Sequence, residues 1–136
     1  MAREQNLAIA QEFLGRMGRG EAPEKVAELF SETLEWEIAG DVGALPWLGR
    51  KHGRQAIVDF VRDAAQLIER IRFEVHDILA NDAKAVILGE LASRLKSNGA
   101  EAETAFAIVL TISNGKIEHY RMFEDSFAIS LAARAP

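Results

Sequence analysis

Two Asn-Gly turns separate three long apolar stretches in the second half of the chain, and they constrain the fold more than any other feature. Asn98-Gly99 and Asn114-Gly115 each supply two residues that tolerate positive φ, which is the strongest short-range signal of a β-hairpin. The stretches that flank these turns are 85–95, 102–112 and 116–124. The sequence therefore predicts a three-stranded antiparallel meander around which the other elements are arranged.

The middle stretch of this meander is apolar on both of its predicted faces. Phe106, Ile108 and Leu110 alternate with Ala107 and Val109, whereas a strand with one solvated face would alternate apolar and polar residues. We expect the helices of this chain to cover one face of the sheet. A second copy is expected to cover the other, because a soluble monomer does not leave so large an apolar surface exposed. The sequence thus predicts a homodimer through the outer sheet face.

Length and composition predict one soluble domain that spans residues 1–136. The 136 residues are 49% hydrophobic and 27% charged, with a net charge of −5, as in globular proteins with a real core. Scattered Lys and Arg in an acidic chain argue against nucleic-acid binding. No apolar run is long enough to cross a membrane. The absence of cysteine suits a reducing compartment, so we expect a cytoplasmic protein.

Before the meander, the chain reads as helix, short helix, strand, long loop and helix. Helical apolar stripes run through 7–17, which includes Phe13, and through 57–68. Apolar and acidic residues alternate around Trp36, as in a half-buried strand. A further strand is expected to begin at Phe73, and Ser126 suits the N-cap of a final helix.

Residues 39–51 show no periodicity and are rich in Gly and Pro, which predicts a loop long enough to suggest a function. Trp47 in this loop is either a core aromatic or a lid over a cavity. The lid is the favoured interpretation, because a Trp that follows Pro46 in a long loop has few helix-borne neighbours against which to pack.

Several short motifs, taken in order, resemble the NTF2-like superfamily and within it the SnoaL-like and ketosteroid-isomerase-like branch. The motifs are LEWEIAG at 34–40, LPWLG at 45–49, HGRQAIVDF at 52–60 and GKIEHYR at 115–121. The resemblance implies an α+β fold in which a strongly bent antiparallel sheet wraps around N-terminal helices as a cone. Such a cone opens at one end into an apolar pocket, and family members are commonly dimers. Isomerases, cyclases, hydrolases and binding modules share it, so the fold does not name a reaction.

The catalytic groups of two family branches are missing at the matching positions. Ile38 and Ile108 stand where ketosteroid isomerases carry their base and their neutral acid. Met122 stands where epoxide hydrolases of the family carry a catalytic Asp. The SnoaL-type cyclases match better, because they have acidic residues where this chain has Glu124 and Asp125.

Strand alternation places Tyr120, Met122 and Glu124 on one face of the last strand, and the resemblance implies that this face lines the pocket. A carboxyl group in apolar surroundings has a raised pKa, which a general base near neutral pH needs. Glu124, Asp125 and Tyr120 are therefore the catalytic candidates. In the alternative interpretation, Glu124 and Asp125 lie in solvent and cap the following helix.

The expected ligand is a small apolar molecule bound without a cofactor. The residues predicted to contact it are Trp36, Trp47, Met122, Phe13 and Glu90. Glu90 interrupts an apolar strand, so we expect it to pair with an arginine or to reach the pocket mouth. No metal site is expected, because the three histidines share no ligand-like spacing.

Two functions therefore remain open from the sequence. One is an isomerase, cyclase or hydrolase that applies carboxylate acid–base chemistry to an apolar cyclic substrate. The other is a non-catalytic dimeric module that binds a ligand or a partner chain. The residues that face the pocket would distinguish the two.

Overall fold

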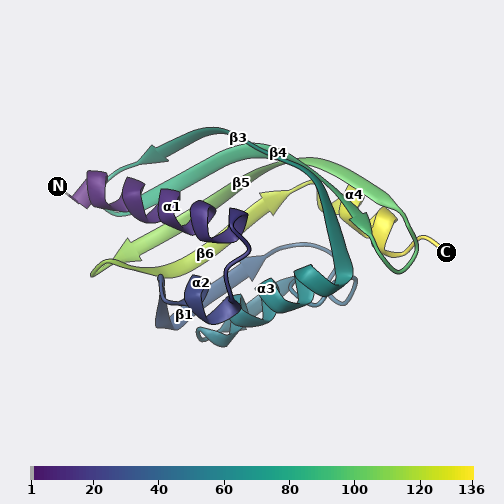
Figure 1. Ribbon diagram of the computed structural model, residues 1–136, viewed down its shortest axis with the longest axis horizontal. Coiled ribbons are helices and arrows are strands. Elements are labelled where there is room, and N and C mark those ends of the chain that lie inside the picture. Colours follow the sequence, from purple (N-terminus) through teal and green to yellow (C-terminus); the bar gives the residue numbers. More distant parts are fainter. Residues whose placement is uncertain (1) are drawn as a thin grey trace.

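A curled sheet of six strands wraps around the N-terminal helices (Figure 1). The structure, a computed structural model, describes residues 2–136. The helices are α1 (Ala2–Gly18), α2 (Pro23–Ala27), α3 (Gln55–Leu67) and α4 (Ser126–Ala133). The strands are β1 (Phe30–Ile38), β2 (Gly49–His52), β3 (Ile68–Ala80), β4 (Lys84–Leu95), β5 (Glu101–Ser113) and β6 (Lys116–Glu124). The predicted α+β fold is confirmed.

The strands follow the order β2-β1-β6-β5-β4-β3 in the sheet. All neighbours pair antiparallel except β1 and β6, which run parallel. This pairing brings the first and last strands together in the middle of the sheet, so residues far apart in sequence share one wall. Within residues 2–136, no helix is both long and apolar enough to cross a lipid bilayer.

Strands β4, β5 and β6 form the predicted meander, and their bounds differ from the predicted ones by one residue at most. Asn114 and Gly115 have φ values of 52° and 73°. Positive φ at both central residues gives a two-residue hairpin turn that follows the right-handed twist of the strands. The turn chemistry read from the sequence therefore sets the register of this hairpin.

The boundary between α3 and β3 differs from the prediction. The helix ends at Leu67, and β3 begins at Ile68, five residues before the predicted start at Phe73. Residues 68–72 pair with the end of β4, with Ile68 opposite Leu95. The apolar residues keep their helical spacing as far as Ile68, one residue beyond the end of α3. The hydrogen bonds between β3 and β4 outweigh that helical pattern at Ile68. The earlier start adds Arg70 to the strand.

Two local predictions at element ends were also wrong. The loop predicted over 39–51 ends early, because Gly49–His52 forms β2 and pairs with β1. The N-cap of α4 is Asp125 rather than Ser126, and its Oδ1 atom accepts a hydrogen bond of 3.0 Å from the Ala128 N–H. Asp and Ser are about equally good N-caps, and the negative charge of Asp also interacts favourably with the positive end of a helix.

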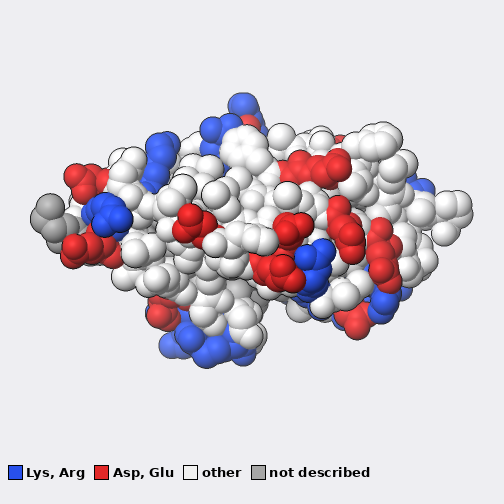
Figure 2. All heavy atoms as spheres, turned by 90° about the horizontal axis from the view of Figure 1, so that it is seen from above, with Lys and Arg blue, Asp and Glu red and all other residues white. Residues whose placement is uncertain are grey.

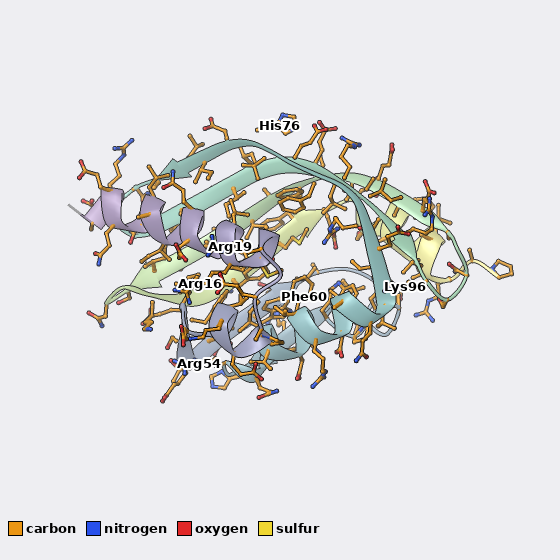
Figure 3. All side chains as sticks on the ribbon, viewed as in Figure 1. Arg16, Arg19, Arg54, Phe60, His76 and Lys96 are labelled. Atoms are coloured by element: carbon orange, nitrogen blue, oxygen red, sulfur yellow. The ribbon has the colours of Figure 1, made fainter. Side chains whose placement is uncertain are left out.

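The hydrophobic core lies between the inner face of the sheet and helices α1 and α3. Phe106, Ile108 and Leu110 of β5 are buried there, while Ala107 and Val109 face the other side and keep part of their surface exposed. Phe60 projects from α3 into the interior (Figure 3). The expected cover of the inner face by the helices is therefore present. The cover of the outer face by a second copy stays a prediction.

Candidate functional site

Two neighbouring cavities lie between the helices and the inner face of the sheet. The larger has a volume of about 460 Å³ and is lined by Phe13, Leu14, Met17, Gly18, Phe60, Arg70, Phe73, Val75, Ile108, Tyr120 and Met122. The smaller has a volume of about 50 Å³ and is lined by Leu45, Trp47, Phe60, Ile68, Arg70, Leu91, Ser93, Leu95, Ala102, Met122, Glu124, Ile129 and Ala132. Phe60, Arg70 and Met122 belong to both walls and separate the two spaces.

Among residues 2–136, Glu124 is the only acidic residue that lines either cavity. Its carboxyl group forms no hydrogen bond or ion pair with the part of the chain that the structure describes. Burial raises the pKa of the Glu124 carboxyl to about 7, and the positive charge of Arg70 offsets only part of this effect. A carboxyl group with such a pKa exchanges protons readily at neutral pH.

Arg70 faces Glu124 from β3, and sequence reasoning missed it. Its Nη1 donates a 2.6 Å hydrogen bond to the Oγ of Ser93, and its Cζ lies 5.5 Å from the centroid of the Phe73 ring. A bulge at Ile71 puts Arg70 and Arg72 on opposite faces of the strand. Plain alternation would place both arginines on one face, so no pattern in the sequence identifies Arg70 as a cavity residue.

Tyr120 and Phe13 line the larger cavity, and Trp36 does not. Tyr120 is 2% exposed, and its hydroxyl lies 3.9 Å from the Sδ of Met122. Burial, followed by the nearby charge of Glu124, raises the pKa of the Tyr120 phenol, which therefore stays protonated and can donate a hydrogen bond. Trp36 stacks behind Tyr120, away from the cavity, and Phe13 meets Tyr120 edge to face at 6.1 Å.

Trp47 forms part of the wall of the smaller cavity. It is 7% exposed, and its ring meets Phe60 edge to face at a centroid distance of 5.4 Å. Its carbonyl oxygen accepts a 2.9 Å hydrogen bond from the indole N–H of Trp36. The structure therefore matches the core alternative for Trp47 rather than the favoured lid, because the curl of the sheet brings α3 and β1 against the loop.

Besides Trp36, two more of the residues predicted for the site, Asp125 and Glu90, lie outside the cavity walls. Asp125 is exposed and lines neither cavity, because its carboxylate caps α4. Glu90 is exposed on the outer face of the sheet, where its Oε2 lies 2.9 Å from the Nε2 of His76. It neither pairs with an arginine nor reaches the mouth of a cavity, so both expectations for Glu90 were wrong. Its exposure removes the need for a cationic partner that a buried carboxylate would have.

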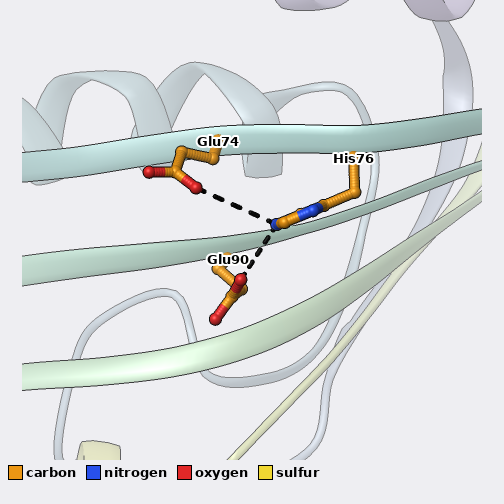
Figure 4. Close-up of side chains that lie close together, drawn as sticks. All are labelled: Glu74, His76 and Glu90. Atoms are coloured by element: carbon orange, nitrogen blue, oxygen red, sulfur yellow. Dashed lines mark ion pairs between the residues drawn. The ribbon is translucent and has the colours of Figure 1, made fainter.

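Glu74, His76 and Glu90 form a cluster on this outer face (Figure 4). Glu74 and Glu90 are directly opposite on β3 and β4, and His76 is the extra residue of a bulge beside them. One ligand atom from each lies within 4.8 Å of the others, so these are the residues that offer a metal-like donor set in the described chain. Their side chains are about half exposed and lie away from the cavities. Figure 2, seen from this side, shows acidic side chains gathered towards the middle and right.

Comparisons with known proteins place the chain among small curled α+β proteins. The family model described as the SnoaL-like domain matches residues 10–120. An NTF2-like protein from Burkholderia xenovorans LB400 superposes with a TM-score of 0.86 at 23% identity, covering 97% of this chain and 98% of that chain. No curated protein sequence matches the chain.

Two further solved structures carry names of different activities. A proposed SnoaL-like polyketide cyclase from Mesorhizobium loti has a TM-score of 0.70 at 18% identity and covers 85% of this chain and 96% of that chain. An epoxide hydrolase from M. tuberculosis, described as LEH-like, has a TM-score of 0.71 at 16% identity and covers 95% and 89%. At such identities the likeness shows the fold, and the chemistry must be argued from the side chains.

Proposed function

Because the chain belongs to the family of SnoaL-like domains, we propose that it binds a small apolar cyclic molecule and moves a proton on it with the carboxyl group of Glu124, without a cofactor. The observation that carries this proposal is the position of Glu124. It is an unpartnered carboxyl group in a cavity wall that is otherwise apolar apart from Arg70 and Ser93. A charged carboxyl group in such surroundings lowers the stability of the fold. Groups of this kind are concentrated at functional sites, and proton transfer is a function that needs one.

The two cavities divide the roles that this reaction needs. The larger one, at about 460 Å³, has the size and the aromatic lining of a small-molecule site. The smaller one, at about 50 Å³, holds a single functional group or a few waters beside Glu124. In the proposal, the ring system fills the larger space and a carbonyl group passes Met122 to reach the smaller one.

The chemistry follows from the pKa of Glu124. With a pKa of about 7, roughly half of the carboxyl groups are charged at neutral pH. The charged form takes a proton from the carbon beside the carbonyl group, and the protonated form returns it at another position. Tyr120, held protonated by burial, is in the wall of the larger cavity as a possible donor to an oxygen of the ring system.

Proton exchange on a cyclic ketone tests this function. The NMR signal of β-tetralone in deuterated buffer reports exchange at the carbon beside its carbonyl group. We expect the wild-type protein to accelerate this exchange, with a rate that rises as the pH passes through about 7. Glu124→Gln should abolish the acceleration. Glu118→Gln is the matched control, because Glu118 lies on the same strand but lines neither cavity. Equal acceleration by Glu124→Gln and the wild type would contradict the proposal.

A non-catalytic binding module is the second candidate. It is favoured by one observation: Asp125, the other predicted acid, is engaged as a helix cap, so among the described residues Glu124 is the single carboxylate in the cavity walls. Acid–base reactions often use two groups with different pKa values. Under this alternative, β-tetralone binds in the larger cavity and its exchange rate stays at the buffer value.

We also propose that two copies associate through the outer faces of β5 and β6. Val109 and Ala107 keep part of their surface exposed there, and Phe123 is 47% exposed. An exposed apolar sheet face of this kind is a common site of association. Sedimentation equilibrium at micromolar concentration should give twice the mass of the chain. A monomer mass would contradict the proposed dimer.

A further inference from the structure

In the part of the chain that the structure describes, Arg70 is the only cationic residue that lines either cavity, and it lines both. Its guanidinium group is positioned by two contacts, the hydrogen bond to Ser93 and the ring of Phe73. The Ser93 hydroxyl is 2.6 Å from Nη1 and is itself buried. Arg70 is an exposed residue, so it lies at the mouth of the cavity rather than at its end. A guanidinium group held in this way is prepared for an incoming ligand.

No carboxylate of the described chain lies within ion-pair distance of Arg70. Arg72, its neighbour on β3, differs in this respect: it lies on the outer face, 3.6 Å from Glu74 and 3.8 Å from Glu103. Ser93 accepts from only one of the N–H groups of Arg70. Because Arg70 is exposed, water reaches its remaining N–H donors, and an acceptor group on a ligand can replace that water in the plane of the guanidinium group.

Glu124, the single acidic residue that residues 2–136 contribute to these walls, does not act as that acceptor. It lies beyond ion-pair distance from Arg70, and the attraction between them is smaller than the effect of burial on Glu124. An anionic oxygen group on a ligand would bind Arg70 with two parallel N–H···O hydrogen bonds, the geometry that arginine and carboxylates prefer.

We infer that the ligand carries one anionic oxygen group, such as a carboxylate or an enolate, which binds the guanidinium group of Arg70 while the apolar body fills the larger cavity. This inference rests on the proposed function, since it names the class of molecule that the same cavities accept. It assigns Arg70 to ligand recognition. Ser93 acts as a positioning residue, because it contacts Arg70 rather than the ligand.

Two fluorescent probes that share one ring system test the inference. Anilinonaphthalene sulfonate carries an anionic group, and N-phenylnaphthylamine is its neutral counterpart. Both brighten in apolar surroundings, so the same titration yields both dissociation constants. We expect the wild-type protein to bind both probes and to prefer the anionic one. In Arg70→Met, the affinity for the anionic probe should fall by about tenfold or more, with the neutral probe little changed.

Arg72→Met is the matched control, because it removes the same charge from the same strand on the outer face. It should leave both affinities unchanged. Arg70→Lys, which keeps the charge, should retain part of the anion preference, and Ser93→Ala should reduce it. Circular dichroism of each variant verifies the fold.

Each other outcome identifies which proposal fails. Equal binding of the two probes by the wild type, or an equal loss of both in Arg70→Met, would overturn the inference and leave the proposed apolar site intact. An equal loss of anion preference in Arg72→Met would also overturn it, because the effect would then reflect net charge alone. Binding of neither probe would overturn both the inference and the proposed function.

Discussion

The indole ring of Trp36 lies flat against the phenol ring of Tyr120, with their centroids 4.3 Å apart and an interplanar angle of 7°. The two residues are paired in register on the parallel strands β1 and β6. Tyr120 therefore presents one side of its ring to the larger cavity and rests the other on Trp36. The wall that a ligand would contact is supported from behind by a fully buried aromatic residue.

Substitutions of these two residues should have unequal effects. Trp36→Ala removes the support and leaves a void, so the free energy of unfolding should fall by about 3–5 kcal/mol. Tyr120→Phe keeps the ring and loses a hydroxyl whose partner is a sulfur atom 3.9 Å away, so it should change stability by less than about 1.5 kcal/mol. Urea unfolding followed by circular dichroism measures both values. A Trp36→Ala protein as stable as the wild type would contradict the buried position of Trp36.

Ile108 and Val109 are neighbours in β5 that face opposite sides of the sheet. Ile108 is 3% exposed and Val109 keeps part of its surface exposed. Ile108→Asp should yield little soluble protein, because an unpaired charge inside costs several kcal/mol, comparable with the whole stability of a domain. Val109→Asp should yield a folded monomer, since the new charge would face the same charge on the second copy in the proposed dimer. Expression yield and sedimentation equilibrium distinguish them, and normal expression of Ile108→Asp would contradict the strand assignment.

The direct opposition of Glu74 and Glu90 predicts a stabilising substitution. Like charges opposite each other on adjacent strands repel, and only His76 lies between these two. Glu90→Lys should raise the free energy of unfolding by about 0.2–1 kcal/mol at low salt, because it places opposite charges across the pair and keeps the 3.6 Å contact between Glu74 and Arg72. The gain should shrink in high salt, which screens exposed charges. A loss of stability at low salt would contradict this prediction, because the interactions among Glu74, His76 and Glu90 would then be favourable in sum.

The sequence predicts the fold well because its signals are local. Asn114 and Gly115 adopt the positive φ values that their residue types favour, and the apolar alternation of β5 matches its burial. Strand alternation also puts Tyr120, Met122 and Glu124 on the side of β6 that lines the cavities. These features depend on neighbouring residues in one strand, so they can be read without the tertiary structure.

The missed features depend on contacts between distant segments. Arg70 reaches the cavity because a bulge at Ile71 changes the alternation of β3, and no residue type marks that bulge. Trp36 lies behind Tyr120 because β1 pairs with β6, a parallel contact that sequence spacing does not reveal. Asp125 and Glu90 differ, because local structure places both away from the cavities: Asp125 caps α4, and Glu90 alternates onto the outer face of β4 with Val86 and Leu88.

Removal of the Glu124 charge should change how stability depends on pH. The folded-state pKa of Glu124, about 7, lies above its ordinary value of 4.5. The carboxyl group therefore favours the folded state fully below pH 4.5, and this contribution fades as the pH rises through about 7. Glu124→Gln, which mimics the protonated form, should be as stable as the wild type near pH 4 and more stable at pH 8, by up to roughly 3 kcal/mol. Urea unfolding at both pH values measures the difference, and equal stability at pH 8 would mean that Glu124 is solvated.

The proton on Glu124 can be followed directly by carbon-detected NMR. In protein with carbon-13 in its glutamate carboxyl groups, comparison with Glu124→Gln assigns the signal, and a pH titration gives its midpoint. We predict a midpoint near 7, because burial outweighs the attraction of Arg70. A midpoint at or below 4.5, the ordinary value for a glutamate, would show a solvated or ion-paired carboxylate and would contradict the role of Glu124 as the base in this cavity.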